Sequence, residues 1–151
     1  MCSSDLSFAL SSDDLVIDIG SNVGVLLDGF KRRGCKVLGV DPAKNIAAIA
    51  EHNGIPTIGD FFTPKLANTI REEHQRAKVI TGSNVFAHVD DLNSLVAGIQ
   101  DLLEADGVFI IEAPYLMHLL DNLEYETVYH EHLSYISIKP LVPFFERHGM
   151  A

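Results

Sequence analysis

The sequence predicts an α/β fold built on a mostly parallel, doubly wound sheet. Short apolar runs alternate along the chain with segments of helical periodicity, and glycine or proline stands at many of the junctions. Strands that alternate with helices of about ten to fifteen residues form β-α-β units, in which the strands pair in parallel. The length of 151 residues and the hydrophobic content of 47% suit one globular domain with one core.

The expected strands are short apolar runs that end at glycine, aspartate or proline. They cover residues 15–20, 35–41, 55–58, 77–81 and 108–112, the last one after a turn at Asp106-Gly107. The expected helices place apolar residues at helical spacing, and the stripe from Leu92 to Leu103 is the most regular of them. They cover residues 23–33, 45–52, 64–75, 92–103 and 140–148.

The turn after the first strand carries the strongest local signal for a nucleotide ligand. Gly20 and Gly24 have no Cβ, so the backbone can approach a ligand closely there. The dinucleotide fingerprint G-x-G-x-x-G fails, because Asn22 and Val25 stand where its later glycines belong. The stretch instead has an acid-x-Gly-x-x-x-Gly pattern that starts at Asp18, and it resembles the first motif of the S-adenosyl-L-methionine (SAM) methyltransferases. A tight strand-to-helix turn that simply favours glycine is the alternative.

The ends of the other strands supply polar residues to the same expected site, since ligands of open α/β sheets bind at the carboxyl ends of the strands. Asp41 lies about twenty residues beyond Gly20, where an acid accepts hydrogen bonds from ribose hydroxyls. Its alternative role is to cap the following helix. Asp60 is expected to bind the adenine amino group with Phe61 packed on the ring, or to be a loop acid.

Three further polar residues complete the expected cofactor site. Asn84 and His88 follow the fourth strand, and Asp18 lies inside the first strand, where a buried acid needs partners. Asp18 is expected either to contact the ligand or to accept hydrogen bonds from the amides of the glycine turn.

Composition excludes several classes of function. The formal charge of −10 disfavours nucleic-acid binding, which needs basic surface. Cys2 and Cys35 are far apart, and the histidines lack the H-E-x-x-H spacing, so no metal site is expected. No apolar run approaches the length of a membrane span, and no signal peptide is evident. We therefore expect a cytoplasmic protein that binds neither membrane nor nucleic acid.

Three stretches together carry a more specific resemblance, and segments 54–57 and 112–115 also fit it. The stretches are Ile19-Gly20-Ser21-Asn22, Ser83-Asn84-Val85-Phe86-Ala87-His88 and Tyr129-His130-Glu131-His132-Leu133-Ser134-Tyr135. The chain resembles the catalytic core of the sugar C-methyltransferases, which methylate nucleotide-linked 4-keto deoxysugars at C3. The resemblance implies a Rossmann-like class I SAM methyltransferase fold, SAM as cofactor and a nucleotide sugar as substrate.

The run from Tyr129 to Tyr135 contains two imidazoles, a carboxylate and two phenols within seven residues, which favours a functional site over a surface loop whose polar residues face water. C-methylation beside a ketone needs a base for a carbon-bound proton and hydrogen-bond donors for the enolate. The resemblance makes His132 the base, with Tyr129 at the ketone or enolate oxygen. Glu131 is then expected to bind a sugar hydroxyl or to orient an imidazole, and His130 is secondary.

The sequence also departs from the family pattern. Val23 stands where the family often has an acid. The resemblance also implies an N-terminal zinc-binding domain and a C-terminal domain, and we expect this chain to contain neither. We expect a lead-in over residues 1–14 and a core over 15–151 whose last strands are missing. An exposed sheet edge would favour self-association. The isolated fragment is expected to bind SAM weakly and to have little or no transferase activity.

Three other functions compete with this interpretation. An O- or N-methyltransferase would need a base for a hydroxyl or amine, and His88 or His132 could serve. A non-catalytic SAM-binding module would keep the fold alone. A nicotinamide-dependent oxidoreductase is disfavoured by the glycine spacing.

Overall fold

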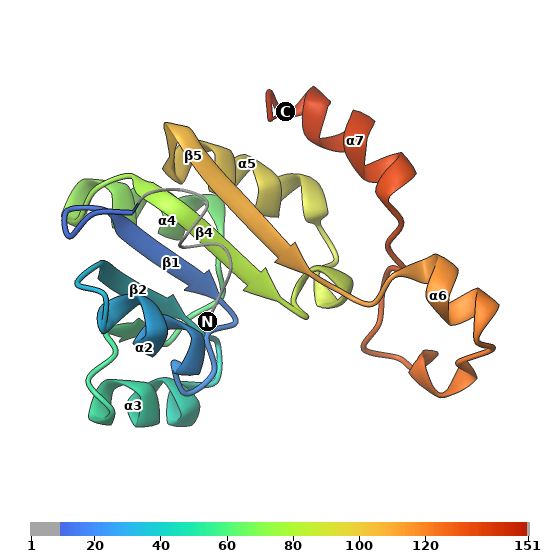
Figure 1. Cartoon of the computed structure of the whole chain (residues 1–151), viewed down its shortest axis with the longest axis horizontal. Helices are drawn as coiled ribbons and strands as arrows, with labels where there is room; N and C mark the ends of the chain where they lie inside the picture. Colours follow the sequence, from blue (N-terminus) through green and yellow to red (C-terminus); the bar gives the residue numbers. More distant parts are fainter. Residues whose placement is uncertain (1–9, 151) are drawn as a thin grey trace.

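The structure is a computed structural model that describes residues 10–150. Strands and helices alternate along the chain as predicted (Figure 1). The strands are β1 (Leu15–Ile19), β2 (Lys36–Val40), β3 (Thr57–Ile58), β4 (Ala77–Ser83) and β5 (Leu103–Glu112). The α-helices are α2 (Val25–Lys31), α3 (Lys44–His52), α4 (Pro64–Glu73), α5 (Leu92–Leu102), α6 (Leu116–Asp121) and α7 (Ile138–Arg147), and two 3₁₀ turns are η1 (Phe86–His88) and η2 (Tyr125–Thr127).

The sheet has the order β3-β2-β1-β4-β5, and each neighbouring pair of strands is parallel. The strand order reverses beside β1, which pairs with both β2 and β4. Parallel strands place their carboxyl ends at one edge of the sheet, so the segments that follow β1, β2, β3 and β4 meet there. The predicted doubly wound α/β fold is confirmed.

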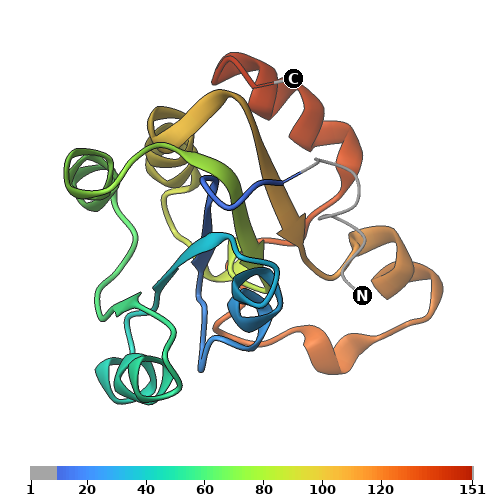
Figure 2. The same ribbon diagram turned by 60° about the vertical axis from the view of Figure 1, so that its left-hand side comes forward.

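Helices cover both faces of this sheet, because β1 is apolar on both sides. Val16 packs with residues of α2 and α3, whereas Ile17 packs with residues of α4 and α5. All five residues of β1 are buried, as expected for a central parallel strand. Figure 2 shows α2 on the opposite side of the sheet from α4 and α5.

The predicted turn at Asp106-Gly107 lies instead within β5. Ala77 pairs with Leu103, but Val79 pairs with Val108, so β5 contains several extra residues opposite a single residue of β4. That single residue is Lys78, whose ammonium group lies 2.6 Å from the Asp106 carboxylate and 3.8 Å from that of Glu104. The ion pairs link this irregular segment of β5, which contains the predicted turn, to β4.

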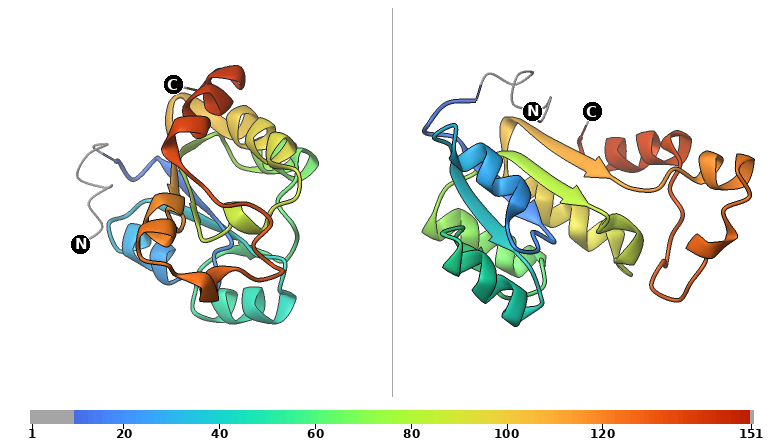
Figure 3. Two further views of the ribbon diagram at one scale, coloured as in Figure 1. Left: turned by 90° about the vertical axis from the view of Figure 1, so that its right-hand side faces the viewer. Right: turned by 60° about the horizontal axis from the view of Figure 1, so that its bottom comes forward.

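The chain beyond β5 was predicted only in part. The last helix is present as α7, and Phe144 and Phe145 pack around Phe86 of η1. Helix α6 and the turn η2 were not predicted. Figures 1 and 3 show the segment between β5 and α7 projecting beyond the carboxyl ends of the strands. This segment contains the run from Tyr129 to Tyr135.

The described part of the chain contains no helix that is both long and apolar enough to cross a membrane. Strand β5 has β4 as its neighbour and ends the sheet on that side. Self-association through this edge stays a prediction.

Candidate active site

The glycine turn after β1 has a backbone that few other sequences could adopt. Gly20, Asn22 and Gly24 have φ angles of 73°, 51° and 84°, in the left-handed region. A Cβ added to Gly20 would lie 2.4 Å from Cγ2 of Val85, so side chains are excluded there by space as well as by conformation. The turn therefore requires glycine at residue 20, the first glycine of the predicted motif.

Asp41 connects this turn to the end of β2. Its Oδ2 accepts a hydrogen bond from the backbone N–H of Asn22 at 2.9 Å, and its Oδ1 accepts one from the N–H of Ala43 at 2.9 Å. The side chain is buried. Since a carboxylate offers about four lone-pair positions, Asp41 keeps acceptor capacity for a ligand.

Asp18 has a partner that the sequence did not indicate. It is buried in β1, and its Oδ1 accepts a hydrogen bond from the Thr81 hydroxyl of β4 at 2.7 Å. The N–H groups of Gly20 and Asn22 go to Val40 and Asp41 instead. Burial raises the pKa of Asp18 to about 6, although the Thr81 hydrogen bond lowers it, and the charge of Asp41 adds a smaller upward contribution.

Asp60 and Phe61 follow β3 at the same edge of the sheet. Asp60 accepts a hydrogen bond from the N–H of Phe61 at 2.8 Å, and the Phe61 ring is 69% exposed. An aromatic ring this exposed has its face free for a ligand. Phe61 belongs to neither hydrophobic cluster of the core, so core packing does not explain its position.

Asn84 and His88 both lie after β4, but they contact different parts of the chain. Asn84 has a φ angle of 57°, and its N–H donates to the Glu112 carbonyl at the end of β5. His88 ends η1, and its Nδ1 lies 2.8 Å from the backbone carbonyl oxygen of Glu131. Because a carbonyl only accepts, Nδ1 of His88 is the donor. His88 thereby contacts the loop that carries the predicted catalytic residues.

His132 is held at both ring nitrogens. Its Nδ1 lies 2.8 Å from the carbonyl oxygen of Thr127, and its Nε2 lies 2.9 Å from the Tyr129 hydroxyl. Nδ1 must donate to the carbonyl, so in the neutral imidazole Nε2 carries the lone pair and accepts from Tyr129. The rings of Tyr129 and His88 lie 4.2 Å and 4.9 Å from that of His132.

Main-chain hydrogen bonds bring this loop to the end of β4. The carbonyl oxygen of Ala87 accepts from the N–H groups of Leu133 at 2.7 Å and Ser134 at 3.3 Å. Near the base of the projecting segment, the N–H of Leu116 donates to the carbonyl of Ile136 at 2.8 Å. The structure thus unites His88, Tyr129 and His132 in one cluster. Glu131 contributes its carbonyl, and its side chain is exposed, as is that of His130.

Two residues of the cluster, Thr127 and Tyr135, were given no role in the sequence analysis. Thr127 acts through its carbonyl oxygen, which every residue type has, so no side-chain pattern could reveal it. Tyr135 donates its hydroxyl to the same oxygen at 3.4 Å, and its ring is perpendicular to that of His132. Tyr135 ends the predicted run, and that position was its only signal.

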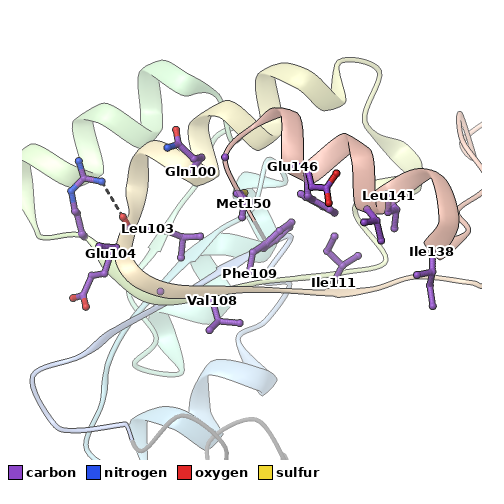
Figure 4. A pocket seen from close by; sticks show the side chains of 16 residues that line it. Gln100, Leu103, Glu104, Val108, Phe109, Ile111, Ile138, Leu141, Glu146 and Met150 are labelled. Atoms are coloured by element: carbon purple, nitrogen blue, oxygen red, sulfur yellow. Dashed lines mark hydrogen bonds between the residues drawn. The ribbon is translucent and has the colours of Figure 1, made fainter.

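A separate groove of about 1080 Å³ lies between β5 and α7 (Figure 4). It is lined mainly by apolar side chains, among them Leu103, Val108, Phe109, Leu141 and Met150, and it contains none of the predicted site residues. Residues 10–150 hold no group of three or more His, Cys, Asp and Glu side chains placed to bind a metal ion.

Sequence comparisons identify the family. A family profile described as a methyltransferase domain matches residues 2–151. The chain belongs to the methyltransferase domain family. The methyltransferase chain is 41% identical over 141 residues to C-methyltransferase NovU of Streptomyces niveus, which covers 93% of the chain and 34% of NovU. It is also 27% identical over 97 residues to a ubiquinone biosynthesis O-methyltransferase of Bartonella quintana (strain Toulouse), covering 64% of the chain and 39% of that protein.

Solved structures confirm the methyltransferase fold. A SAM-dependent methyltransferase from Archaeoglobus fulgidus matches with a TM-score of 0.75 at 16% identity, covering 97% of the chain and 72% of that structure. A phosphoethanolamine N-methyltransferase from Haemonchus contortus, solved with SAM, matches with a TM-score of 0.64 at 14% identity, covering 98% of the chain and 36% of that structure. The fold is that of the SAM-dependent methyltransferases, and SAM is the cofactor of this class, as predicted.

The methyltransferase chain spans about a third of the length of the curated relatives it matches. What the complete relatives act on is therefore a matter for proposal.

Proposed function

We propose that this methyltransferase acts on carbon C3 of a nucleotide-linked 4-keto deoxysugar, with His132 as the base that removes the C3 proton. The observation that carries the proposal is the hydrogen-bonded cluster in which the Thr127 carbonyl directs the lone pair of His132 toward the Tyr129 hydroxyl. The identity of 41% with a protein named a C-methyltransferase supports transfer to carbon.

The residues at the carboxyl edge of the sheet fit SAM. When bound, SAM supplies a methyl group that is attached to a cationic sulfonium sulfur. Transfer of the methyl group would leave that sulfur as a neutral thioether. Asp41 would accept from the ribose hydroxyls with its remaining lone pairs, and Asp60 with Phe61 would hold the adenine. The turn from Gly20 to Gly24, through Asn22, would let the backbone approach the cofactor closely.

The other predicted contacts have narrower roles in this proposal. Asn84 lies where the end of β4 meets the cofactor edge, and His88 lies between that edge and the loop. Asp18 would act from beneath the turn, because its carboxylate is buried and bonded to Thr81. A site that contains several carboxylates suits a cationic cofactor.

Proton abstraction needs three groups from the loop. Nε2 of His132 would take the C3 proton, and the C–H electron pair would move into the C3–C4 bond as the carbonyl becomes an enolate. The Tyr129 hydroxyl would donate to the enolate oxygen, where negative charge develops. Glu131, which is exposed beside them, would accept from a sugar hydroxyl. The proton on His132 would later return to solvent.

A second candidate function is methyl transfer to oxygen or nitrogen of another small molecule. The likeness to a ubiquinone biosynthesis O-methyltransferase over 64% of the chain favours it. A hydroxyl also needs a base, and both His88 and His132 donate from Nδ1 to carbonyls, which leaves Nε2 for that task. A SAM-binding module without catalysis would keep the sheet-edge contacts alone.

Calorimetry tests the cofactor half of the proposal. We expect S-adenosylhomocysteine to bind and NADH not to bind. The Asp41→Ala variant should lose at least about tenfold in affinity, because hydrogen bonds to a charged group contribute about 1.5–3 kcal/mol. Asp121→Ala, on exposed α6, is the matched control and should bind as the parent does. Binding of NADH in place of S-adenosylhomocysteine would overturn the proposal.

A deuterium-exchange and product assay tests the chemical half. A nucleotide-linked 4-keto-6-deoxyhexose incubated in D₂O with SAM and the full-length enzyme should gain a methyl group at C3. With S-adenosylhomocysteine in its place, we expect exchange of the C3 proton alone. Methylation of a hydroxyl of the same compound would favour the second candidate. Cofactor binding with neither exchange nor methylation would indicate the binding module.

A further inference from the structure

The proposed base of this methyltransferase is covered by another side chain in the structure. Nε2 of His132 is the only ring nitrogen with a lone pair, because Nδ1 donates to the Thr127 carbonyl. The Tyr129 hydroxyl lies 2.9 Å from that Nε2, so its proton points at the lone pair. A base in this state cannot take a proton from a substrate carbon.

The two partners differ in how firmly they are held. His132 is half-buried and anchored through Nδ1, while the Tyr135 ring and the His88 ring lie 6.1 Å and 4.9 Å from its own. The anchoring carbonyl belongs to η2, which is closed by the Thr127 hydroxyl bonding to the Glu124 carbonyl at 2.9 Å. Tyr129 is 43% exposed. Tyr129 is thus the less enclosed of the two partners.

We propose that the Tyr129 hydroxyl is a release switch for the base: it covers Nε2 of His132 in the substrate-free protein and moves away when a substrate carbonyl accepts its hydrogen bond. This inference rests on the function proposed above and deepens it. One hydroxyl carries one proton, so Tyr129 cannot donate to Nε2 and to a carbonyl oxygen at once. Donation to the substrate therefore frees the lone pair at the moment it is needed.

The switch implies a selection rule for substrates. Only a molecule that presents an acceptor within reach of Tyr129 uncovers the base, and the ketone oxygen of a 4-keto sugar is adjacent to the carbon that loses its proton. A compound without this acceptor would bind to a site whose base stays covered. Selectivity would then act on proton abstraction, in addition to binding.

Nitrogen NMR of histidine-labelled protein tests the switch without any turnover. At a pH where the imidazole is neutral, we expect Nδ1 of His132 to carry the proton and Nε2 to show the upfield displacement of a nitrogen that accepts a hydrogen bond. Tyr129→Phe should move the Nε2 resonance downfield. Tyr125→Phe, at a 72% exposed tyrosine of the same segment, should leave it unchanged.

A second arm adds a nucleotide-linked 4-keto-6-deoxyhexose together with S-adenosylhomocysteine. The Nε2 resonance of the parent should then move toward its position in Tyr129→Phe. An Nε2 resonance that is the same in the parent and in Tyr129→Phe overturns the switch, as does a parent resonance that the bound sugar leaves unchanged. The function proposed above is contradicted by a different result, namely the absence of both C3 exchange and methylation in the assay with D₂O. Unaltered backbone amide spectra of Tyr129→Phe confirm that the variant is folded.

Discussion

The two halves of this methyltransferase are held together by different forces. Every buried residue of the described chain lies between Leu15 and Leu103, and none lies in residues 104–150. Most of the exposed large hydrophobic side chains lie between Met117 and Val142. The half that carries the predicted cofactor residues is positioned by close packing. The loop with His132 is positioned by a few hydrogen bonds to η1 and η2.

This contrast separates stability from proposed chemistry. Substitutions in the packed half should change the free energy of unfolding, whereas substitutions in the loop should change turnover and leave the fold intact. Four experiments test this separation.

The largest effect is expected from His132→Ala. Loss of the proposed base should lower kcat by about 100- to 10,000-fold, in the range of general base catalysis, while S-adenosylhomocysteine affinity stays the same. The control is His118→Ala, an exposed histidine of α6. Turnover of the full-length enzyme is measured with saturating SAM and a nucleotide-linked 4-keto deoxysugar, and an unchanged kcat would remove His132 from the mechanism.

The next effect compares the same substitution in the two halves. Leu95→Ala removes a side chain of α5 that is 4% exposed, and it should lower the free energy of unfolding by about 3 kcal/mol. Leu120→Ala removes one of α6 that is 58% exposed, and it should cost less than about 0.5 kcal/mol. Urea denaturation measures both, and equal losses would contradict the contrast between the halves.

Asp18 should make the packed half sensitive to pH. Because its folded-state pKa is raised to about 6, the folded protein holds this proton more tightly than the unfolded chain does. The contribution of this proton to the free energy of unfolding is fully present below about pH 4 and is lost as the pH rises through 6. The parent protein should therefore lose about 2 kcal/mol of stability between about pH 4.5 and about pH 7.5.

The Asp18→Asn variant isolates this contribution, since its amide oxygen can still accept from Thr81. Its stability relative to the parent should rise by that amount over the same interval. A parent and an Asp18→Asn variant with parallel pH curves would argue against a raised pKa.

The smallest effect concerns the caps of two helices. Thr63 accepts a hydrogen bond from the N–H of Leu66 at 3.2 Å at the start of α4, so Thr63→Ala should cost about 1 kcal/mol. Ser137 precedes α7 and makes no side-chain cap, so Ser137→Ala should cost less than about 0.3 kcal/mol. Thermal unfolding compares the two, and a larger cost at Ser137 would show that α7 is anchored more firmly than its contacts suggest.

The packed half was readable from sequence because its signals are local. The apolar run of β1, the glycine turn and the stripe on α5 each require certain residue types at fixed spacing, and the structure has all three. The irregular course of β5 at Asp106-Gly107 was predicted as a turn, because its ion pair with Lys78 joins residues of neighbouring strands that are far apart in the sequence and leaves no local pattern.

For the loop, the sequence predicted which residues are reactive but not how they are arranged. Its sequence indicated His132, Tyr129 and Glu131, and the roles of these residues stay predictions. Their arrangement depends on the backbone carbonyl oxygens of Ala87 and Thr127. Every residue type has such an oxygen, so the sequence does not reveal these contacts. Helix α6 was missed although Leu116, Leu119 and Leu120 have helical spacing, because six residues are too few for this pattern to stand out.

The double acceptor at Ala87 has a consequence for how substrate choice could diverge among relatives. Every residue keeps its carbonyl oxygen and every residue except proline keeps its N–H group, so the anchor of the loop tolerates substitution at Ala87 and any residue other than proline at positions 133 and 134. Mutation can therefore introduce new side chains around the proposed base without detaching the loop. The cofactor machinery need not change in step, and one scaffold can acquire new acceptors by small, independent changes.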